Sequence, residues 1–201
     1  MVKRAFDLTL SLSGIILASP LWLLISLSIL IEDGWPVFYL QERIGKRGSM
    51  FKALKFRSMI KGAEEGIGPV QAIENDPRVT KVGRVLRATA MDELPQLINI
   101  LKGDMSFVGP RALRPAELEV RGNPETVKIE EVPGHNERHA IKPGLTGLAQ
   151  VYLPADAPRQ EKFRYDLFYL ENKSFWLDLK LILLSFWITL RGKWETREEK
   201  I

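Results

Sequence analysis

The stretch LTLSLSGIILASPLWLLISLSILI, residues 8–31, contains no charged residue and has a proline near its centre. As one straight helix it would be about 36 Å long, which is enough for the hydrocarbon core of a bilayer. Pro20 lacks the backbone N–H that a continuous helix needs and clashes with the preceding turn, so we expect a helix break at Ser19-Pro20. Each half would be about 18 Å long, and serine hydroxyls are expected to bond the carbonyls that the bend loosens.

Basic residues flank this stretch on both sides. Lys3 and Arg4 precede it, and seven basic residues follow between positions 43 and 61. Because basic flanks favour the cytoplasmic side, both ends are expected there, and a re-entrant helical hairpin in the inner leaflet satisfies this requirement. One kinked transmembrane helix is the main alternative. A cleaved signal peptide is disfavoured because no small-x-small cleavage site follows.

The remainder of the chain has the mixed composition of a globular protein. Its 201 residues suit a membrane anchor at 1–33 and one domain at 34–201. The net charge of +4 favours anionic lipid or phosphate as partners over nucleic acid. The absence of cysteine excludes disulfides and thiolate chemistry. His135 and His139 lack an HExxH pattern and are weak evidence for zinc.

Helical patterns and a few strand patterns follow the anchor. The predicted elements are strands at 35–41 and 51–59, a loop at 61–77, a helix at 79–90, a helix that starts at Asp92 and ends at Gly103, and an irregular connection with a short helix at 121–144. The two strands are expected to form a β-hairpin across the RIGKRGS turn. The predicted fold class is therefore mainly α with a small β element.

Residues 174–194 form a second apolar segment, rich in aromatic residues with basic neighbours. Asp178 and Lys180 interrupt it, so its uncharged part is short for a membrane span. The pattern is typical of an amphipathic helix that lies in the membrane interface. A buried core helix of the globular domain is the alternative.

Two adjacent carboxylates, Asp92 and Glu93, lie at a predicted helix start. A helix N-terminus favours the charged form, so Asp92 is expected to stay ionised and available as a nucleophile or metal ligand. Two carboxylates with water and phosphate oxygens suit Mg²⁺. Taken alone, such a pair is more often an N-cap beside a solvated acid.

Several basic residues are candidates for phosphate binding. In Gly109-Pro110-Arg111, glycine permits close backbone approach, proline stiffens the turn, and the arginine fork matches a phosphate. Further candidates, which spacing alone does not separate from solvated residues, are Arg43, Lys55, Arg57, Arg84 and Arg87. No P-loop or dinucleotide motif is present. Together with the anchor, these features predict phosphate chemistry at a bilayer surface.

Five segments resemble the bacterial sugar transferase family, the monotopic phosphoglycosyl transferases that begin glycan assembly on a polyprenol carrier. They are KFRSM (55–59), DELPQL (92–97), LKGDMSFVGPR (101–111), KPGLTGLAQV (142–151) and YDLFYLENKSFWLDLK (165–180). The similarity runs in order over almost the whole chain. It resembles the catalytic core of the family, without the additional N-terminal transmembrane region of larger members.

The resemblance implies transfer of a sugar 1-phosphate from a UDP-sugar to polyprenyl (undecaprenyl) phosphate, with release of UMP. This is the first membrane step in assembling an exopolysaccharide, O-antigen, capsule or glycoprotein glycan. It implies that Asp92 is a nucleophile that forms a covalent phosphosugar intermediate, that Glu93 supports it, and that Mg²⁺ lies between this pair and the diphosphate. The residues matched to phosphate binding are Arg111, Arg87, Lys55, Arg57 and Pro110.

The resemblance also implies that 34–201 is a catalytic domain on the cytoplasmic face of the bacterial inner membrane. It leaves open a homodimer and contact with downstream glycosyltransferases. Ala112 departs from the family's Gly-Pro-Arg-Pro pattern, and residues 152–156 lack the usual Gly-Arg pair, so the sugar is not identified. The alternatives are a lipid-binding scaffold, an enzyme using a CDP-linked donor, for which the repeated aspartates are missing, and a nucleic-acid-binding protein.

Overall fold

The computed structural model describes residues 2–65, 75–115 and 129–201. Its helices are α1 (Val2–Asp33), α2 (Lys81–Ala88), α3 (Gln96–Lys102), α4 (His135–Arg138), α5 (Leu148–Tyr152), α6 (Arg159–Asn172) and α7 (Phe175–Arg191). Short 3-10 helices are η1 (Lys46–Gly48), η2 (Met91–Glu93) and η3 (Ile129–Glu131). The mainly helical class with a small β element is confirmed. Parts of the predicted segments 61–77 and 121–144 lie outside the described residues.

Two small sheets stand among these helices. Strands β1 (Phe38–Ile44) and β2 (Met50–Phe56) form the predicted hairpin, with Glu42 opposite Lys52. β1 starts and ends three residues later than predicted, because Ile44 N–H is bonded to the Leu113 carbonyl (2.8 Å) and the strand continues into the expected turn. In the second sheet β3 (Ser106–Val108) lies parallel to β4 (Gly144–Thr146).

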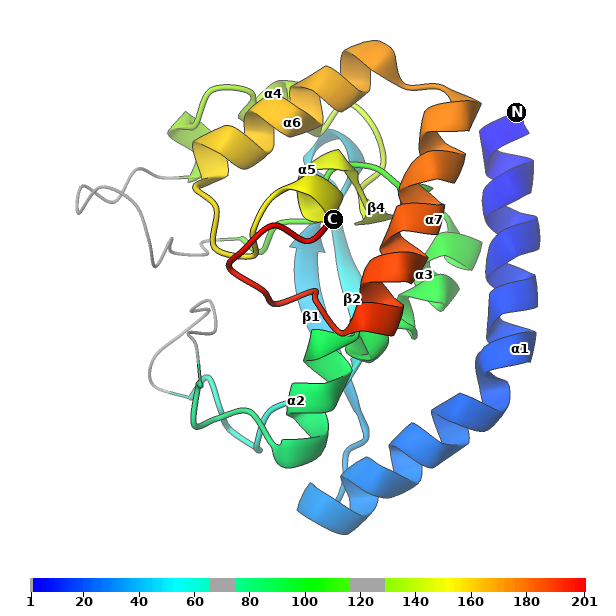
Figure 1. Ribbon diagram of the computed structural model, residues 1–201, viewed down its shortest axis with the longest axis vertical. Coiled ribbons are helices and arrows are strands. Elements are labelled where there is room, and N and C mark those ends of the chain that lie inside the picture. Colours follow the sequence, from blue (N-terminus) through cyan, green and yellow to red (C-terminus); the bar gives the residue numbers. More distant parts are fainter. Residues whose placement is uncertain (1, 66–74, 116–128) are drawn as a thin grey trace.

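The apolar stretch lies in α1, which is one helix that contains Pro20 and bends near its middle (Figure 1). Ser19 Oγ donates to the Ile16 carbonyl (2.8 Å), which is the carbonyl that Pro20 deprives of its usual N–H partner. The expected serine bonding is therefore confirmed at the break. By length and composition α1 is the one helix in the described part of the chain that could cross a membrane. Its large exposed apolar residues are Leu8, Leu12, Ile16, Leu17, Leu23, Leu24, Leu27, Leu30 and Ile31.

Each end of α1 is attached to the domain by polar contacts. Near its N-terminus, Asp7 Oδ1 accepts bonds from the Ser106 hydroxyl (3.1 Å) and the Phe107 N–H (3.0 Å). Arg4 donates to the carbonyls at the C-terminal end of α3, where a positive charge is favoured. Near the other end, the Glu32 carboxylate accepts from the first N–H groups of α2. These contacts hold both halves of the apolar helix against the domain.

The prediction that Asp92 caps a helix is wrong. Asp92 lies inside η2, and α3 begins only at Gln96. Pro95 has no N–H to offer the Met91 carbonyl, so the Leu94 N–H bonds it at the tighter 3-10 spacing instead (3.2 Å). The predicted end of this helix is confirmed, since Gly103 is its C-cap with a φ of 97°.

The apolar C-terminal segment forms α7, which is half buried. Leu181 and Ile188 lie in a core cluster with Val108, Val151 and Tyr169. The opposite face exposes large apolar side chains, namely Trp176, Leu183, Phe186, Trp187 and Leu190. Helix α7 therefore has one face in the core, as the alternative of a buried core helix predicts, and an apolar face at the surface.

Candidate active site

A cavity of about 1500 Å³ lies between the hairpin, η2, α5, α6 and the C-terminal segment. Its walls also include Gly14, Leu17, Ala18 and Leu21 of α1 and Ile182 and Phe186 of α7. Asp92 and Glu93 line it from η2, the turn that Pro95 imposes. One continuous space thus has charged groups in one part and side chains of the two apolar helices in another.

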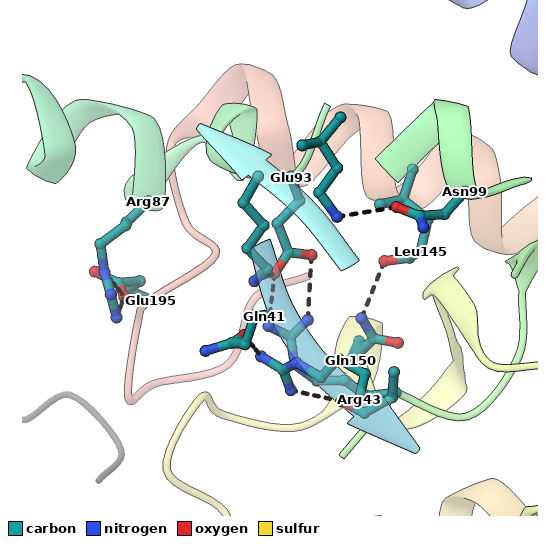
Figure 2. Close-up of polar contacts among 12 residues, drawn as sticks. Gln41, Arg43, Arg87, Glu93, Asn99, Leu145, Gln150 and Glu195 are labelled. Carbon is teal, nitrogen blue, oxygen red and sulfur yellow. Dashed lines mark hydrogen bonds and ion pairs between the residues drawn. The ribbon is translucent and has the colours of Figure 1, made fainter. Parts of the chain in front are cut away.

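Glu93 is fixed by two cations (Figure 2). Lys55 Nζ lies 2.6 Å from Glu93 Oε1, and Arg111 Nη2 lies 2.7 Å from the same oxygen. Burial opposes ionisation of this carboxyl, but the charges of Arg111 and Lys55 outweigh it and hold the pKa of Glu93 far below its usual range. Glu93 is therefore a permanent anion that orders the two cations beside it.

Asp92 is the opposite case. It is only 8% exposed, and the described residues give its carboxylate no hydrogen bond or ion pair. Burial, with a contribution from the charge of Glu93, raises the pKa of Asp92 to about 6, although Lys55 opposes the shift. Desolvation, and not the expected helix N-terminus, therefore dominates the pKa of Asp92. Near pH 7 the carboxylate is still mostly ionised, and its oxygens are unengaged.

Arg111 and Lys55 reach Glu93 because the surrounding backbone is tightly held. The Gly109-Pro110-Arg111 turn lies against β4, where a Cβ on Gly109 would come within 2.5 Å of the Lys142 carbonyl, so only glycine fits. Arg138, almost fully buried and paired with Asp166, donates to the Arg111 carbonyl (2.7 Å). Arg138 therefore holds the backbone of the expected arginine turn in place.

Asn99 of α3 performs the corresponding task for Lys55. Its side chain accepts from the Leu54 N–H (3.0 Å) and donates to the Lys52 carbonyl (2.8 Å), which fixes β2 on α3. Figure 2 shows Asn99 beside this strand, with Glu93 nearby. The position of Lys55 is therefore set by a buried amide that lies outside the charged cluster.

Arg87 and Arg57, which are also predicted to bind phosphate, form ion pairs elsewhere, although the charge of Arg87 still opposes the raised pKa of Asp92. Arg87 lines the cavity but is paired with Glu195 of the C-terminal segment, at 2.6 Å (Figure 2). Arg57 also lines the cavity, but it bonds the carbonyls of Asp33 and Gly34 at the end of α1. The structure thus brings Asp92, Glu93, Lys55 and Arg111 together, with Arg87 and Arg57 at the periphery.

A metal ion at this site would be held sparsely. In the parts of the chain that the structure describes, no three His, Asp or Glu side chains form a metal-binding group. Glu93 is committed to its cations, whereas the unengaged oxygens of Asp92 face a cavity built for anions. This donor set fits Mg²⁺, which keeps several waters and commonly shares one carboxylate with substrate phosphates.

Sequence reasoning missed three residues of this cavity, which are Arg138, Gln150 and Lys200. Arg138 acts through the Arg111 backbone, and nothing in its local sequence indicates that contact. Gln150 lies in the segment 142–151, which resembles the family, but its residue type and spacing indicate no role. Lys200 lies in a charged segment whose path over the domain depends on tertiary contacts.

Charged groups that suit phosphate, beside an exposed apolar helix, define an enzyme class that acts on phosphate-bearing substrates next to a membrane. The sequence model of the bacterial sugar transferase family matches residues 1–192, and the chain belongs to that family. The resemblance stated from the five sequence segments is thereby confirmed.

Relatives of known function give the same class. The chain is 40% identical to "Exopolysaccharide production protein PSS" of Rhizobium leguminosarum, covering 90% of this chain and 92% of that protein. It is 38% identical to "UDP-glucose:undecaprenyl-phosphate glucose-1-phosphate transferase" of Escherichia coli, over 92% of this chain but 39% of that protein. It is 35% identical to "Undecaprenyl-phosphate galactose phosphotransferase" of Salmonella typhimurium, over 94% of this chain and 40% of that protein. The chain spans less than half of these last two proteins.

Proposed function

We propose that the protein transfers a sugar 1-phosphate from a UDP-sugar to undecaprenyl phosphate and releases UMP. Named relatives act on these substrates. The observation that carries the proposal is the inequality of the two neighbouring carboxylates. Glu93 is locked between Lys55 and Arg111, whereas Asp92 is buried beside the same cations with its oxygens unengaged. A desolvated, unpaired carboxylate is the more nucleophilic of the two.

In the first half-reaction an Asp92 oxygen attacks the β-phosphorus of the UDP-sugar. The bond from that phosphorus to the bridging oxygen breaks, UMP leaves with the bonding electrons, and an aspartyl phosphosugar remains. Lys55 and Arg111, held in place by Glu93, stabilise the negative charge on the phosphoryl oxygens.

In the second half-reaction a phosphate oxygen of undecaprenyl phosphate attacks the same phosphorus. The bond to the Asp92 oxygen breaks, so the carboxylate is restored and the lipid-linked diphosphate sugar leaves. This sequence has ping-pong kinetics. Asp92 and substrate oxygens would hold Mg²⁺, which would supply further neutralisation of the diphosphate charge.

The membrane arrangement belongs to the same proposal. The bend of α1 at Pro20, its exposed apolar side chains and its basic flanks support a re-entrant helix in the inner leaflet of the bacterial inner membrane. The apolar outer face of α7 would lie in the interface. The domain at 34–201 then faces the cytoplasm. There it could form a homodimer or contact downstream glycosyltransferases.

The covalent step is tested by intact mass measurement without acceptor. Wild-type protein incubated with Mg²⁺ and a panel of UDP-sugars is expected to gain the mass of one sugar phosphate at Asp92. Asp92→Asn should gain nothing, whereas Glu171→Gln, at an exposed position of α6 outside the cavity, should behave as wild type. Steady-state formation of lipid product by wild-type protein that never carries the adduct would overturn the covalent route.

Topology is tested separately with single cysteines, which is direct because the chain has none. Val2→Cys and Lys46→Cys are both exposed positions on either side of the apolar stretch. In oriented membrane vesicles both should react with an impermeant maleimide from the same side. Labelling from opposite sides would establish a spanning helix instead.

A further inference from the structure

The C-terminal segment, residues 193–201, forms one wall of the cavity. The backbone N–H of Trp194 donates to the Ala88 carbonyl at the end of α2 (3.0 Å), and Glu195 pairs with Arg87. From there the segment returns across the domain and ends beside α5 (Figure 1). It therefore connects the periphery of the charged cluster with the opposite wall of the cavity.

Lys200 near the end of this segment is an unusual buried cation. Its side chain lines the cavity, is 4% exposed, and donates from Nζ to the Gln150 carbonyl (2.9 Å). It also lies 5.5 Å from the centre of the Trp194 ring, but no carboxylate of the described residues pairs with it. Burial and the positive charges of Arg111 and Lys162 lower the pKa of Lys200 to about 8.

A buried ammonium group without an anion is costly, so this arrangement points to an anionic ligand. The neighbouring wall does not supply the missing charge. Among the described residues that line the cavity, basic side chains outnumber acidic ones by twelve to seven. Glu93, the acid nearest to Arg111, is already committed to two cations.

Gln150 gives a second, independent indication at the same place. Its Nε2 donates to the Leu145 carbonyl (3.1 Å; Figure 2), which fixes the orientation of the amide. Gln150 lines the cavity, and its Oε1 is buried with no hydrogen-bond donor among the described residues. A buried acceptor without a partner costs free energy unless a ligand hydroxyl or N–H fills the role.

We propose that Lys200 Nζ and Gln150 Oε1 form a subsite for the nucleotide half of the donor and for UMP after it leaves. Lys200 binds a phosphate oxygen, and Gln150 accepts from a hydroxyl or N–H of the same molecule. This assignment rests on the proposed function, since that function supplies the nucleotide. It adds two binding residues at the end of the cavity away from α1.

Position favours the nucleotide over the phosphate of the lipid acceptor. A polyprenyl chain must lie along the apolar side chains of α1 and α7 that line the cavity. Figure 1 shows the end of the C-terminal segment beside α5, on the other side of α7 from α1. A phosphate attached to a membrane lipid would therefore enter from the side remote from Lys200.

The test compares Lys200→Met with Lys193→Met, which removes the same charge from the same segment outside the cavity. Lys200→Met should raise both the KM for the UDP-sugar and the inhibition constant of UMP about tenfold. The KM for undecaprenyl phosphate should not change. Lys200→Arg should recover most of the loss, and Lys193→Met should match wild type.

Calorimetric titration with UMP alone keeps the test independent of turnover. In this titration Lys200→Met should bind UMP about tenfold more weakly than wild type, with its melting temperature retained because methionine leaves no unpaired buried charge. Equal UMP affinity in wild type and Lys200→Met, with wild type releasing UMP normally, would refute the subsite and leave the transfer reaction standing. A higher KM for undecaprenyl phosphate alone would overturn the nucleotide assignment. If wild-type protein binds UMP through Lys200 but forms no lipid-linked product, the subsite is supported and the proposed transfer reaction is refuted.

Discussion

The charged floor of the cavity and its apolar rim are built on different physical principles. The floor consists of Asp92 and Glu93 of η2 with Lys55 of β2 and Arg111, and the ion pairs of Glu93 with Lys55 and Arg111 hold it together. The rim consists of Leu17, Ala18 and Leu21 of α1 with Ile182 and Phe186 of α7, of which Leu17 and Phe186 are exposed and the other three half-buried. Changes in the floor should therefore affect stability and chemistry together, whereas changes in the rim should affect only the lipid substrate.

The largest expected effect is on the floor, at Asp92. Asp92→Asn should reduce UMP release by about a thousandfold or more, because the amide cannot act as the nucleophile. Its free energy of unfolding at pH 7 should rise, by up to about 3 kcal/mol, because the folded state raises the pKa of Asp92 and therefore carries its charge at a cost. Urea unfolding and a UMP-release assay measure the two quantities. A variant that is both inactive and less stable would show that the Asp92 charge is paired.

Glu93 sharpens the contrast within the floor. Glu93→Gln should destabilise the fold by about 3 kcal/mol, because Lys55 would remain buried without its anion; Arg111, whose side chain is 47% exposed, adds little to this cost. Glu195→Gln is the control, since this carboxylate also pairs with an arginine but is 47% exposed and should cost less than about 1 kcal/mol. Both are measured by urea unfolding at pH 7. Equal costs would mean that burial of the Glu93 ion pairs contributes nothing.

Protonation of Asp92 gives an effect of intermediate size. Since its pKa is raised to about 6, UMP release should be half-maximal near pH 6 and fall about tenfold for each further pH unit below it. Glu93 stays ionised over this range, because its pKa is far below the usual one. Values of kcat/KM for the donor between pH 5 and 8, which report the pKa of the free enzyme, give the profile, with melting curves to confirm folding. A rate that is level down to pH 5 would exclude Asp92 as the titrating nucleophile.

The sequence predicts the rim better than the floor. Residues 8–31 are apolar enough to specify a helix, and Ser19-Pro20 marks its break, because both signals are local. The local sequence singles out Asp92 and Glu93 as an acid pair. It does not show that, among the described residues, Glu93 is ion-paired whereas Asp92 is not. That inequality depends on Lys55 and Arg111, which lie 38 and 18 residues from Glu93 in the chain and meet it only after folding.

Two further features were not predicted, each for a different reason. Asp92 was expected to cap a helix because its own residue type favours that position, but Pro95 moves the start of α3 to Gln96. Helix α6 was not predicted as an element, although it supplies Asp166 to the buried pair that supports Arg111. The first feature is local, because Pro95 lacks the N–H that would bond the Met91 carbonyl. The second is not, because Asp166 and Arg138 lie 28 residues apart and meet only after folding.

The smallest expected effect is at the rim, and it tests whether the rim contacts lipid. Leu17 and Leu23 both lie on α1 and are 80% and 63% exposed, but only Leu17 lines the cavity. Leu17→Ala should raise the KM for undecaprenyl phosphate about fivefold, as expected for losing about 1 kcal/mol of apolar contact, and leave the KM for the UDP-sugar unchanged. Leu23→Ala should change neither. If both variants raise the lipid KM equally, α1 acts as a general membrane surface and the acceptor chain does not follow the rim into the site.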